Sequence, residues 1–164
     1  MMKLFFALAL AACTLSLTAA PAPAQPAVKG NVVETAVAAG QFKTLVMLVK
    51  RAGLAGALQK PGPYTVFAPT DAAFERVPKT TLRALLADKG KLRSVLLYHV
   101  VEGRVTAAAA AKLTSAKTLN GQRVRIRLMF GGVFVNSAKV VTPDVMATNG
   151  VIHVINRVLI PPAR

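Results

Sequence analysis

Apolar residues recur at helical spacing through the first two thirds of the chain and at strand spacing in the last third. The helical spacing predicts helices over residues 32–37, 42–51, 54–58, 80–87, 91–98 and 106–112, and a short helix capped by Thr70 or Asp71. Asn31 followed by Glu34 is the sequence of a capping box, which starts the first helix. Residues 64–68 are apolar and rich in β-branched and aromatic types, so they predict a buried strand among these helices.

The last third alternates strictly between arginine and aliphatic residues over positions 123–128. This alternation predicts a strand with two unlike faces, formed by Arg123, Arg125 and Arg127 on one side and by Val124, Ile126 and Leu128 on the other. Turn signals rich in Asn and Gly surround this strand, at residues 120–121, 131–132, 136–137 and 149–150. A final strand is predicted over residues 151–158. A β-meander after a helical part indicates an α+β domain.

Charge is the compositional feature that most changes this picture. The chain of 164 residues carries 21 basic and 6 acidic side chains, for a net charge of +15. The length suits one domain with a real core, and that core is aliphatic because the chain has no tryptophan and few aromatic residues. An excess of positive charge favours solubility and affinity for anionic surfaces.

The N-terminus has the pattern of an export signal, with Lys3 before an apolar run over residues 4–17. Small residues at 22–24 favour cleavage before Gln25, which predicts a signal peptide over 1–24, a linker over 25–30, a folded domain over 31–161 and a tail over 162–164. The alternative is a lipoprotein, because residues 10–13 resemble a bacterial lipobox that ends at Cys13. The first route predicts a secreted or periplasmic protein and the second a membrane-anchored one, with no other run long enough to span a bilayer.

Cysteine usage limits the chemistry of the exported domain. Cys13 is the only cysteine of the chain, so a domain that starts at Gln25 has no disulfide, no thiolate nucleophile and no cysteine-ligated metal.

Three segments resemble the fasciclin domain, an extracellular adhesion module. They are the sequence Tyr-Thr-Val-Phe-Ala-Pro-Thr-Asp-Ala-Ala-Phe at 64–74, the pair Tyr98-His99, and the run from Asn149-Gly150 to Pro161. The resemblance covers residues 31–161 and implies a β-wedge of two small sheets with helices packed along one edge. It implies structural roles for Phe67, Thr70, Asp71, Phe74, Tyr98, His99, Asn149, Gly150 and His153. We expect Phe67, Phe74, Ile152 and Val154 to share one core.

His99 and His153 are the candidate catalytic residues, and both lie within apolar runs. The alternative role is a buried ring that hydrogen-bonds the backbone. A metal site would need carboxylate help, and carboxylates are scarce, so we expect no metal and no cofactor. Asp71 and Glu75 are one helical turn apart, which suits either acid–base chemistry or a helix cap beside a solvated acid. The chain has no phosphate-binding glycine loop, and the pattern favours a protein without enzymatic activity.

Arg123, Arg125 and Arg127 form a candidate anion-binding row, about 7 Å from one to the next along the strand. Arginine binds phosphates, sulfates and carboxylates in a bidentate manner. The alternative is a solvated face whose charge prevents edge aggregation. A second basic cluster is Lys89, Lys91 and Arg93. Nucleic acid is not expected as a partner, because no aromatic residue interleaves the arginines and the protein is exported.

Residues 142–146 resemble the Pro-Asp-Ile-Met integrin-contact motif that some animal fasciclin domains carry. Pro143, Asp144 and Met146 match it, and Val145 replaces isoleucine. The alternative is a capped turn, with Thr142 as the cap, Pro143 at the first helical position and Asp144 in the first turn.

The function expected from the sequence is a non-catalytic adhesion or surface-binding module outside the cytoplasm. The expected partners are a cell-surface or matrix protein, or an acidic glycan or lipid. The two alternatives are a hydrolase or metal-dependent enzyme that uses His99 or His153, and a structural or assembly role through contacts between domains.

Overall fold

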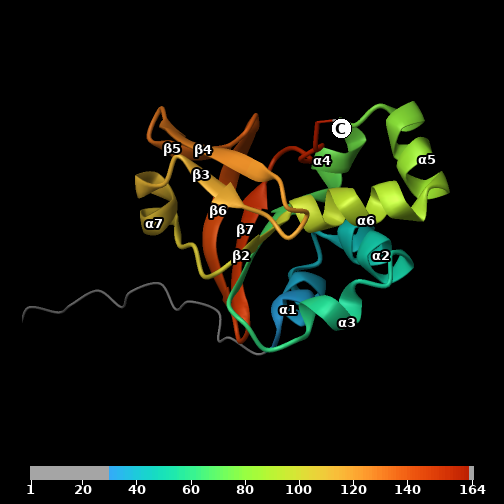
Figure 1. Ribbon diagram of the computed structural model, residues 1–164, viewed down its shortest axis with the longest axis horizontal. Coiled ribbons are helices and arrows are strands. Elements are labelled where there is room, and N and C mark those ends of the chain that lie inside the picture. Colours follow the sequence, from blue (N-terminus) through green and yellow to red (C-terminus); the bar gives the residue numbers. More distant parts are fainter. Residues whose placement is uncertain (1–29, 163–164) are drawn as a thin grey trace, which may run out of the picture.

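The computed structural model describes residues 30–162, where seven helices lie beside a seven-stranded sheet (Figure 1). The helices are α1 (Val32–Ala39), α2 (Lys43–Arg51), α3 (Ala55–Leu58), α4 (Asp71–Glu75), α5 (Lys79–Ala87), α6 (Lys89–Tyr98) and α7 (Ala107–Lys112). The strands are β1 (Tyr64–Pro69), β2 (Val100–Glu102), β3 (Ser115–Lys117), β4 (Arg123–Met129), β5 (Gly132–Val135), β6 (Ala138–Ala147) and β7 (Gly150–Ile155). The expected signal peptide, Cys13, residues 25–29 of the linker and residues 163–164 of the tail lie outside the described residues.

The strands follow the order β2-β1-β7-β6-β5-β4-β3, and β1 runs parallel to β7 whereas all other neighbours are antiparallel. An isolated bridge between Val101 and Thr118 joins the two ends of this order, so the sheet nearly closes. The α+β class and the wedge are confirmed. The two small sheets are continuous with each other through β6, which pairs with β5 at Ala138–Lys139 and with β7 from Val140 onward.

The core consists of two clusters, because β1 and β7 are buried on both faces. Val66, Ile152 and Val154 face the helices and pack in one cluster with Phe74 of α4, which we call the helix-side cluster. Phe67 belongs to the other group, the strand-side cluster, which is filled by β4, β5, β6 and α7. The expectation of one shared core for all four residues was therefore wrong for Phe67. In parallel register Phe67 is opposite His153, and successive side chains along a strand point to opposite faces.

Helices α1 to α6 occupy one side of the sheet, and α7 lies by itself against the β4–β5 end (Figure 1). Most helix boundaries follow the predicted spacing, and the capping box of Asn31 and Glu34 is present. Helix α5 begins at Lys79, before Thr80 and Thr81, with Pro78 ahead of its first residue and no side-chain cap. None of the helices in residues 30–162 is long and apolar enough to cross a membrane.

The meander departs from the sequence prediction in four places. Strand β3 was not predicted, and Gly132 lies within β5, since the turn is formed by Phe130 and Gly131. Strand β7 ends at Ile155 and not at residue 158. The Asn156 N–H still donates to the Lys139 carbonyl, but the Lys139 N–H donates to the side-chain Oδ1 of Asn156, so the backbone ladder stops there. Leu128 is 60% exposed although Val124 and Ile126 of the same strand face are buried, since the core ends before it.

Candidate functional site

The predicted arginine row lies on the outer face of the β3–β6 part of the sheet. Cross-strand pairing places further basic side chains on that face. Lys117 of β3 is opposite Arg123. On the other side, Arg127 is opposite Phe134 of β5, and Phe134 is opposite Lys139 of β6. Residues opposite each other in a ladder project to the same side. We call the set the basic face, and its five charged members are all exposed: Lys117, Arg123, Arg125, Arg127 and Lys139.

The basic face has no acidic neighbours in the sequence that forms it. Residues 103–143 contain seven basic side chains and no Asp or Glu. Within residues 30–162 the one ion pair is Lys91 with Asp88 at 3.7 Å, on the exposed start of α6. Like charges directly opposite each other destabilise a ladder, so the pairing of Lys117 with Arg123 is unfavourable.

Tyr98 and Asn136 fix the backbone of the strand that carries the arginines. The Tyr98 hydroxyl donates to the Arg123 carbonyl at 3.4 Å and accepts from Asn136 Nδ2 at 3.0 Å. Asn136 Oδ1 accepts from the Arg125 N–H at 2.9 Å, and its own N–H donates to the Arg125 carbonyl at 2.7 Å. Asn136 has φ 53, a left-handed conformation that Asn adopts readily. The buried Tyr98 therefore holds the exposed basic face in register.

His99 follows the last residue of α6, and both of its ring nitrogens meet backbone groups. Nδ1 lies 2.8 Å from the Val95 carbonyl oxygen, and the Leu159 N–H donates to Nε2 at 2.9 Å. Because Nε2 accepts, the ring carries its proton on Nδ1 and donates it to Val95. Burial lowers the pKa of His99 to about 4, and the hydrogen bond to Val95 only partly offsets that effect. The ring is therefore neutral at neutral pH.

His153 lies in β7 and makes the same kind of contacts with its nitrogens exchanged. Nε2 lies 2.6 Å from the Val105 carbonyl oxygen, and the Asp144 N–H donates to Nδ1 at 3.3 Å, so the proton is on Nε2. The ring stacks on Phe67 with centroids 5.6 Å apart. The Thr65 hydroxyl accepts from the Val105 N–H at 2.8 Å. Both backbone groups of Val105 are thus held by side chains of the central strands.

The structure does not bring the two histidines together. His99 lines an apolar cavity of about 30 Å³ with residues of the helix-side cluster, whereas His153 stacks within the strand-side cluster. All four ring nitrogens face backbone partners, which leaves neither ring with a nitrogen directed at a substrate. Among residues 30–162, no three His, Cys, Asp or Glu side chains are placed to hold a metal ion.

Asp71 caps a helix other than its own. Its Oδ1 accepts from the Thr44 N–H at 2.9 Å, at the start of α2, while Thr70 caps α4. Burial alone would raise the pKa of Asp71, but hydrogen bonds from Thr44 and the Lys43 backbone, and the Lys43 charge, outweigh it and lower the pKa. Glu75, the other member of the candidate carboxylate pair, is exposed. The arrangement supports a cap beside a solvated acid.

Asp144 also caps a helix from a distance. Its Oδ1 accepts from the Ala107 N–H at 2.8 Å, at the first residue of α7. No helix starts at Thr142 or Pro143, so that alternative was wrong: residues 142–144 lie within β6, where the register shifts twice. Asp144 has φ 55, so the strand bulges there and turns its carboxylate toward α7. Val145 and Met146 are half-buried and Pro143 is exposed.

Asn149 and Gly150 join the start of β7 to the helices. Asn149 Oδ1 accepts from the Val32 N–H at 2.9 Å, and its Nδ2 donates to the Leu58 carbonyl at 2.7 Å. A Cβ at Gly150 would overlap the Tyr64 carbonyl oxygen of the neighbouring parallel strand. Both residue types are therefore required by close contacts within the fold.

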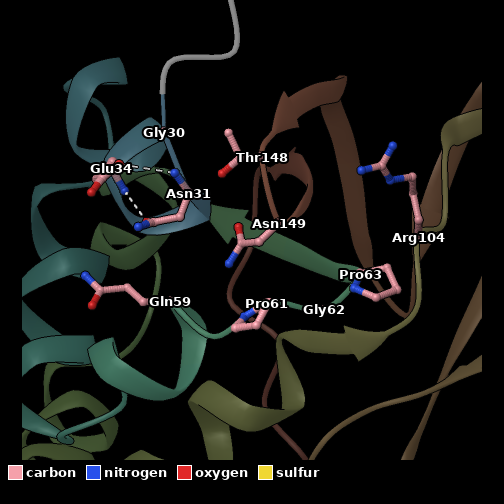
Figure 2. Close-up of a pocket in the computed structure, with 10 residues that line it drawn as sticks. All are labelled: Gly30, Asn31, Glu34, Gln59, Pro61, Gly62, Pro63, Arg104, Thr148 and Asn149. Atoms are coloured by element: carbon pink, nitrogen blue, oxygen red, sulfur yellow. Dashed lines mark hydrogen bonds between the residues drawn. The ribbon is translucent and has the colours of Figure 1, made fainter.

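A polar pocket of about 600 Å³ opens beside these residues (Figure 2). Figure 2 shows Asn31 and Glu34 on one side of it and Arg104 on the opposite side. The side chains of Asn31 and Asn149 already bind the first N–H groups of α1, and Glu34 accepts from the Asn31 N–H at 3.2 Å. The side chains of Gln59, Arg104 and Thr148 also line the pocket.

The second basic cluster is less coherent than the basic face. Lys89, Lys91 and Arg93 are exposed on α6, but Lys91 pairs with Asp88, whose carboxylate also caps that helix. Hydrogen bonds from Lys91 lower the pKa of Asp88, so the acid is ionised and neutralises part of the cluster.

One exposed group was missed in the sequence. Leu128, Met129 and Phe130 are consecutive, apolar and exposed at the tip of the β4–β5 hairpin, and we call them the apolar tip. The available signal was an uninterrupted apolar triplet directly before Gly131-Gly132, where a hairpin turn normally carries polar residues.

Comparison with known proteins agrees with this architecture. The sequence profile described as Fasciclin domain matches residues 40–161. Protein sll1735 of Synechocystis sp. is 42% identical over 130 residues, covering 79% of this chain and 97% of the relative. Protein sll1483 of Synechocystis sp. is 46% identical over 134 residues, covering 80% of this chain and 74% of the relative.

Among solved structures, the FAS1 domain pair of the insect cell adhesion molecule Fasciclin I is similar with a TM-score of 0.65 and 20% identity. The similarity covers 80% of this chain, which spans 51% of that structure. The profile match over residues 40–161, the two relatives and the shared wedge show that this chain belongs to the fasciclin domain family.

Proposed function

We propose that this protein is a non-catalytic adhesion or surface-binding module that acts outside the cytoplasm and binds anionic groups of a cell envelope or matrix through its basic face. The fasciclin domain family includes an adhesion protein, insect Fasciclin I. The engaged ring nitrogens of His99 and His153 give no support to the hydrolase or metal-enzyme alternative.

The observation that supports this proposal is that positively charged residues of the basic face lie beside one another across strands without an acidic residue to neutralise them. Lys117 and Arg123 are directly opposite, and Lys139 lies one strand beyond Arg127, on the far side of Phe134. No acidic residue occurs in residues 103–143 to offset them. A ligand with regularly spaced phosphate, sulfate or carboxylate groups would supply the missing negative charge.

The test is binding of a sulfated polysaccharide to the wild-type chain and to a triple variant, Arg123→Gln, Arg125→Gln and Arg127→Gln. We expect the triple variant to lose most of its affinity. The wild-type affinity should also fall steeply with salt, because the screening length drops from about 10 Å at 0.1 M to about 3 Å at 1 M.

The matched control removes the same number of charges from the helical side. Lys43, Lys50 and Lys60 are exposed on or next to α2 and α3, and we would replace all three by Gln. This control should retain most of the affinity. Equal losses in the two triple variants, or binding that is indifferent to salt, would reduce the basic face to an ordinary charged surface.

A further inference from the structure

The apolar tip is the most exposed apolar group of the strand region. Leu128 is 60% exposed, Met129 42% and Phe130 93%. Met129 pairs with Gly132, so Phe130 and Gly131 are the two central residues of the turn. The hairpin projects at the end of the wedge farthest from α1 to α6 (Figure 1). Three consecutive apolar side chains are therefore exposed to solvent at the tip of this hairpin.

Phe130 is poorly suited to its position by the rules of hairpin turns. Its φ is 51 and that of Gly131 is 71, which are the left-handed values that Asn-Gly adopts most readily. A bulky residue with positive φ is a genuine outlier that is strained unless something compensates. The same chain uses Asn136 at the left-handed position of the next hairpin. At 93% exposure Phe130 gains almost nothing from packing within the fold, so a compensating contact would have to come from outside it.

The surroundings of the apolar tip indicate what that contact is. Arg127 is two residues from Met129, about 7 Å along the strand, and it shares the outer face with Phe134 and Lys139. Lys139 also lies over Gly132, where a Cβ would be 3.4 Å from its Cε. An apolar protrusion with a basic surround and no acid matches the layering of an anionic membrane, whose apolar interior lies beneath negative headgroups. A binding groove for a peptide would instead be concave.

We propose that the apolar tip inserts into the surface of an anionic lipid bilayer, with Phe130 deepest and the basic face against the headgroups. This inference rests on the proposed function and deepens it by naming the ligand class. The basic face supplies long-range attraction, and the apolar tip supplies a contact that only a bilayer offers. The membrane is thus distinguished from an acidic polysaccharide, which presents charge without an apolar interior.

The first experiment compares Phe130→Asn with wild type in flotation with vesicles of phosphatidylglycerol and phosphatidylcholine. We expect vesicle affinity to fall by roughly tenfold or more, as when one large apolar side chain leaves the membrane. Binding to the sulfated polysaccharide should stay within about twofold. Asn favours the left-handed turn, so Phe130→Asn should melt no lower than wild type, which separates lost insertion from lost folding.

Met47→Gln is the matched control, since Met47 is an apolar residue 64% exposed on α2. It should bind vesicles like wild type. A second measurement uses Phe130→Trp, because the chain has no other tryptophan. Its emission should shift to shorter wavelength with vesicles containing phosphatidylglycerol and be quenched by brominated lipid.

The outcomes separate the two proposals. If Phe130→Asn binds vesicles as tightly as wild type, or if the Phe130→Trp emission does not move, insertion is refuted. The proposed function then still stands, provided that the triple Arg→Gln variant loses both vesicle and polysaccharide binding. If Phe130→Asn weakens polysaccharide and vesicle binding equally, the apolar tip is not specific for lipid and the inference fails. If the triple variant still binds both vesicles and the polysaccharide, the proposed function fails, and the inference that rests on it fails too.

Discussion

His99 and His153 are held in opposite tautomers by backbone groups. His99 carries its proton on Nδ1 and accepts on Nε2, whereas His153 carries its proton on Nε2 and accepts on Nδ1. Protonation of His99 would turn its acceptor Nε2 into a second donor that faces the Leu159 N–H. The bond between His99 and Leu159, 60 positions apart in the sequence, therefore requires the neutral ring.

The first prediction follows from the depressed pKa of His99. An unfolded histidine has a pKa near 6.5, whereas the folded His99 has a pKa of about 4, so the unfolded chain binds the extra proton between these values. The contribution of His99 to the free energy of unfolding should be constant above about pH 7 and fall by about 3 kcal/mol on going down to pH 4. Urea denaturation at pH 7, 6, 5 and 4 measures this change.

The control is His99→Gln, which cannot titrate. Its free energy of unfolding should be lower than that of wild type at pH 7, and flatter between pH 6.5 and pH 4. Subtracting the two profiles removes the contribution of the other ionisable groups. Parallel profiles would show that His99 is protonated in the folded protein as readily as in the unfolded chain.

The second prediction concerns the contact between Gly150 and Tyr64. An added methyl group at Gly150 would overlap the Tyr64 carbonyl oxygen and force the central parallel strands β1 and β7 apart. Gly150→Ala should therefore destabilise the fold by about 3 kcal/mol, at the upper end of overpacking effects. Gly56→Ala is the control, because Gly56 lies in α3 with no atom near its Cβ position, and it should stabilise by about 0.5–1 kcal/mol. Chemical denaturation of the two variants would contradict this account if their effects were equal.

The third prediction separates the hydrogen bond of Asp144 from its charge. Asp144→Ala removes the acceptor for the Ala107 N–H and places Ala at φ 55, so it should cost about 2 kcal/mol. Asp144→Asn keeps an acceptor oxygen and tolerates the left-handed conformation, so it should cost less than about 0.5 kcal/mol. Thermal melts of both variants measure the difference. Equal losses would mean that the charge at the α7 start, and not the hydrogen bond, stabilises the bulge.

Local features of this fold could be predicted from the sequence because they depend on neighbours in the chain. The capping box of Asn31 and Glu34, the amphipathic α2 and the exposed arginines of β4 depend on spacing within a few residues. Helix caps made at a distance could not be predicted in this way. Asp71 and Asp144 each cap a helix that begins 27 or more positions away, so their partners depend on the completed fold.

The prediction for β4 was correct about which face each residue lies on, but wrong about how far along the strand the inner face is buried. The alternation put Leu128 on the inner face with Val124 and Ile126, and the inner face of β4 is indeed buried as far as Ile126. How far a core extends along a strand depends on what covers its inner face, and Leu128 stays 60% exposed although Val133 of β5 lies opposite it in the ladder. The apolar tip was therefore not predicted, because the alternation had assigned Leu128 to the inner face of the strand.

The final prediction uses the like-charged pair of the basic face. Lys117→Glu replaces repulsion toward Arg123 by attraction, so it should raise stability by about 0.5–1 kcal/mol. The same change removes positive charge from the basic face and should lower affinity for the sulfated polysaccharide. Lys60→Glu makes an identical charge change in the exposed loop after α3, and it should leave stability and most of the affinity unchanged. Stability gained together with affinity lost, in the Lys117 variant alone, would show that the chain retains a destabilising pair because its ligand needs it. If both variants lose affinity equally, net charge explains the binding and the alignment of the basic face does not.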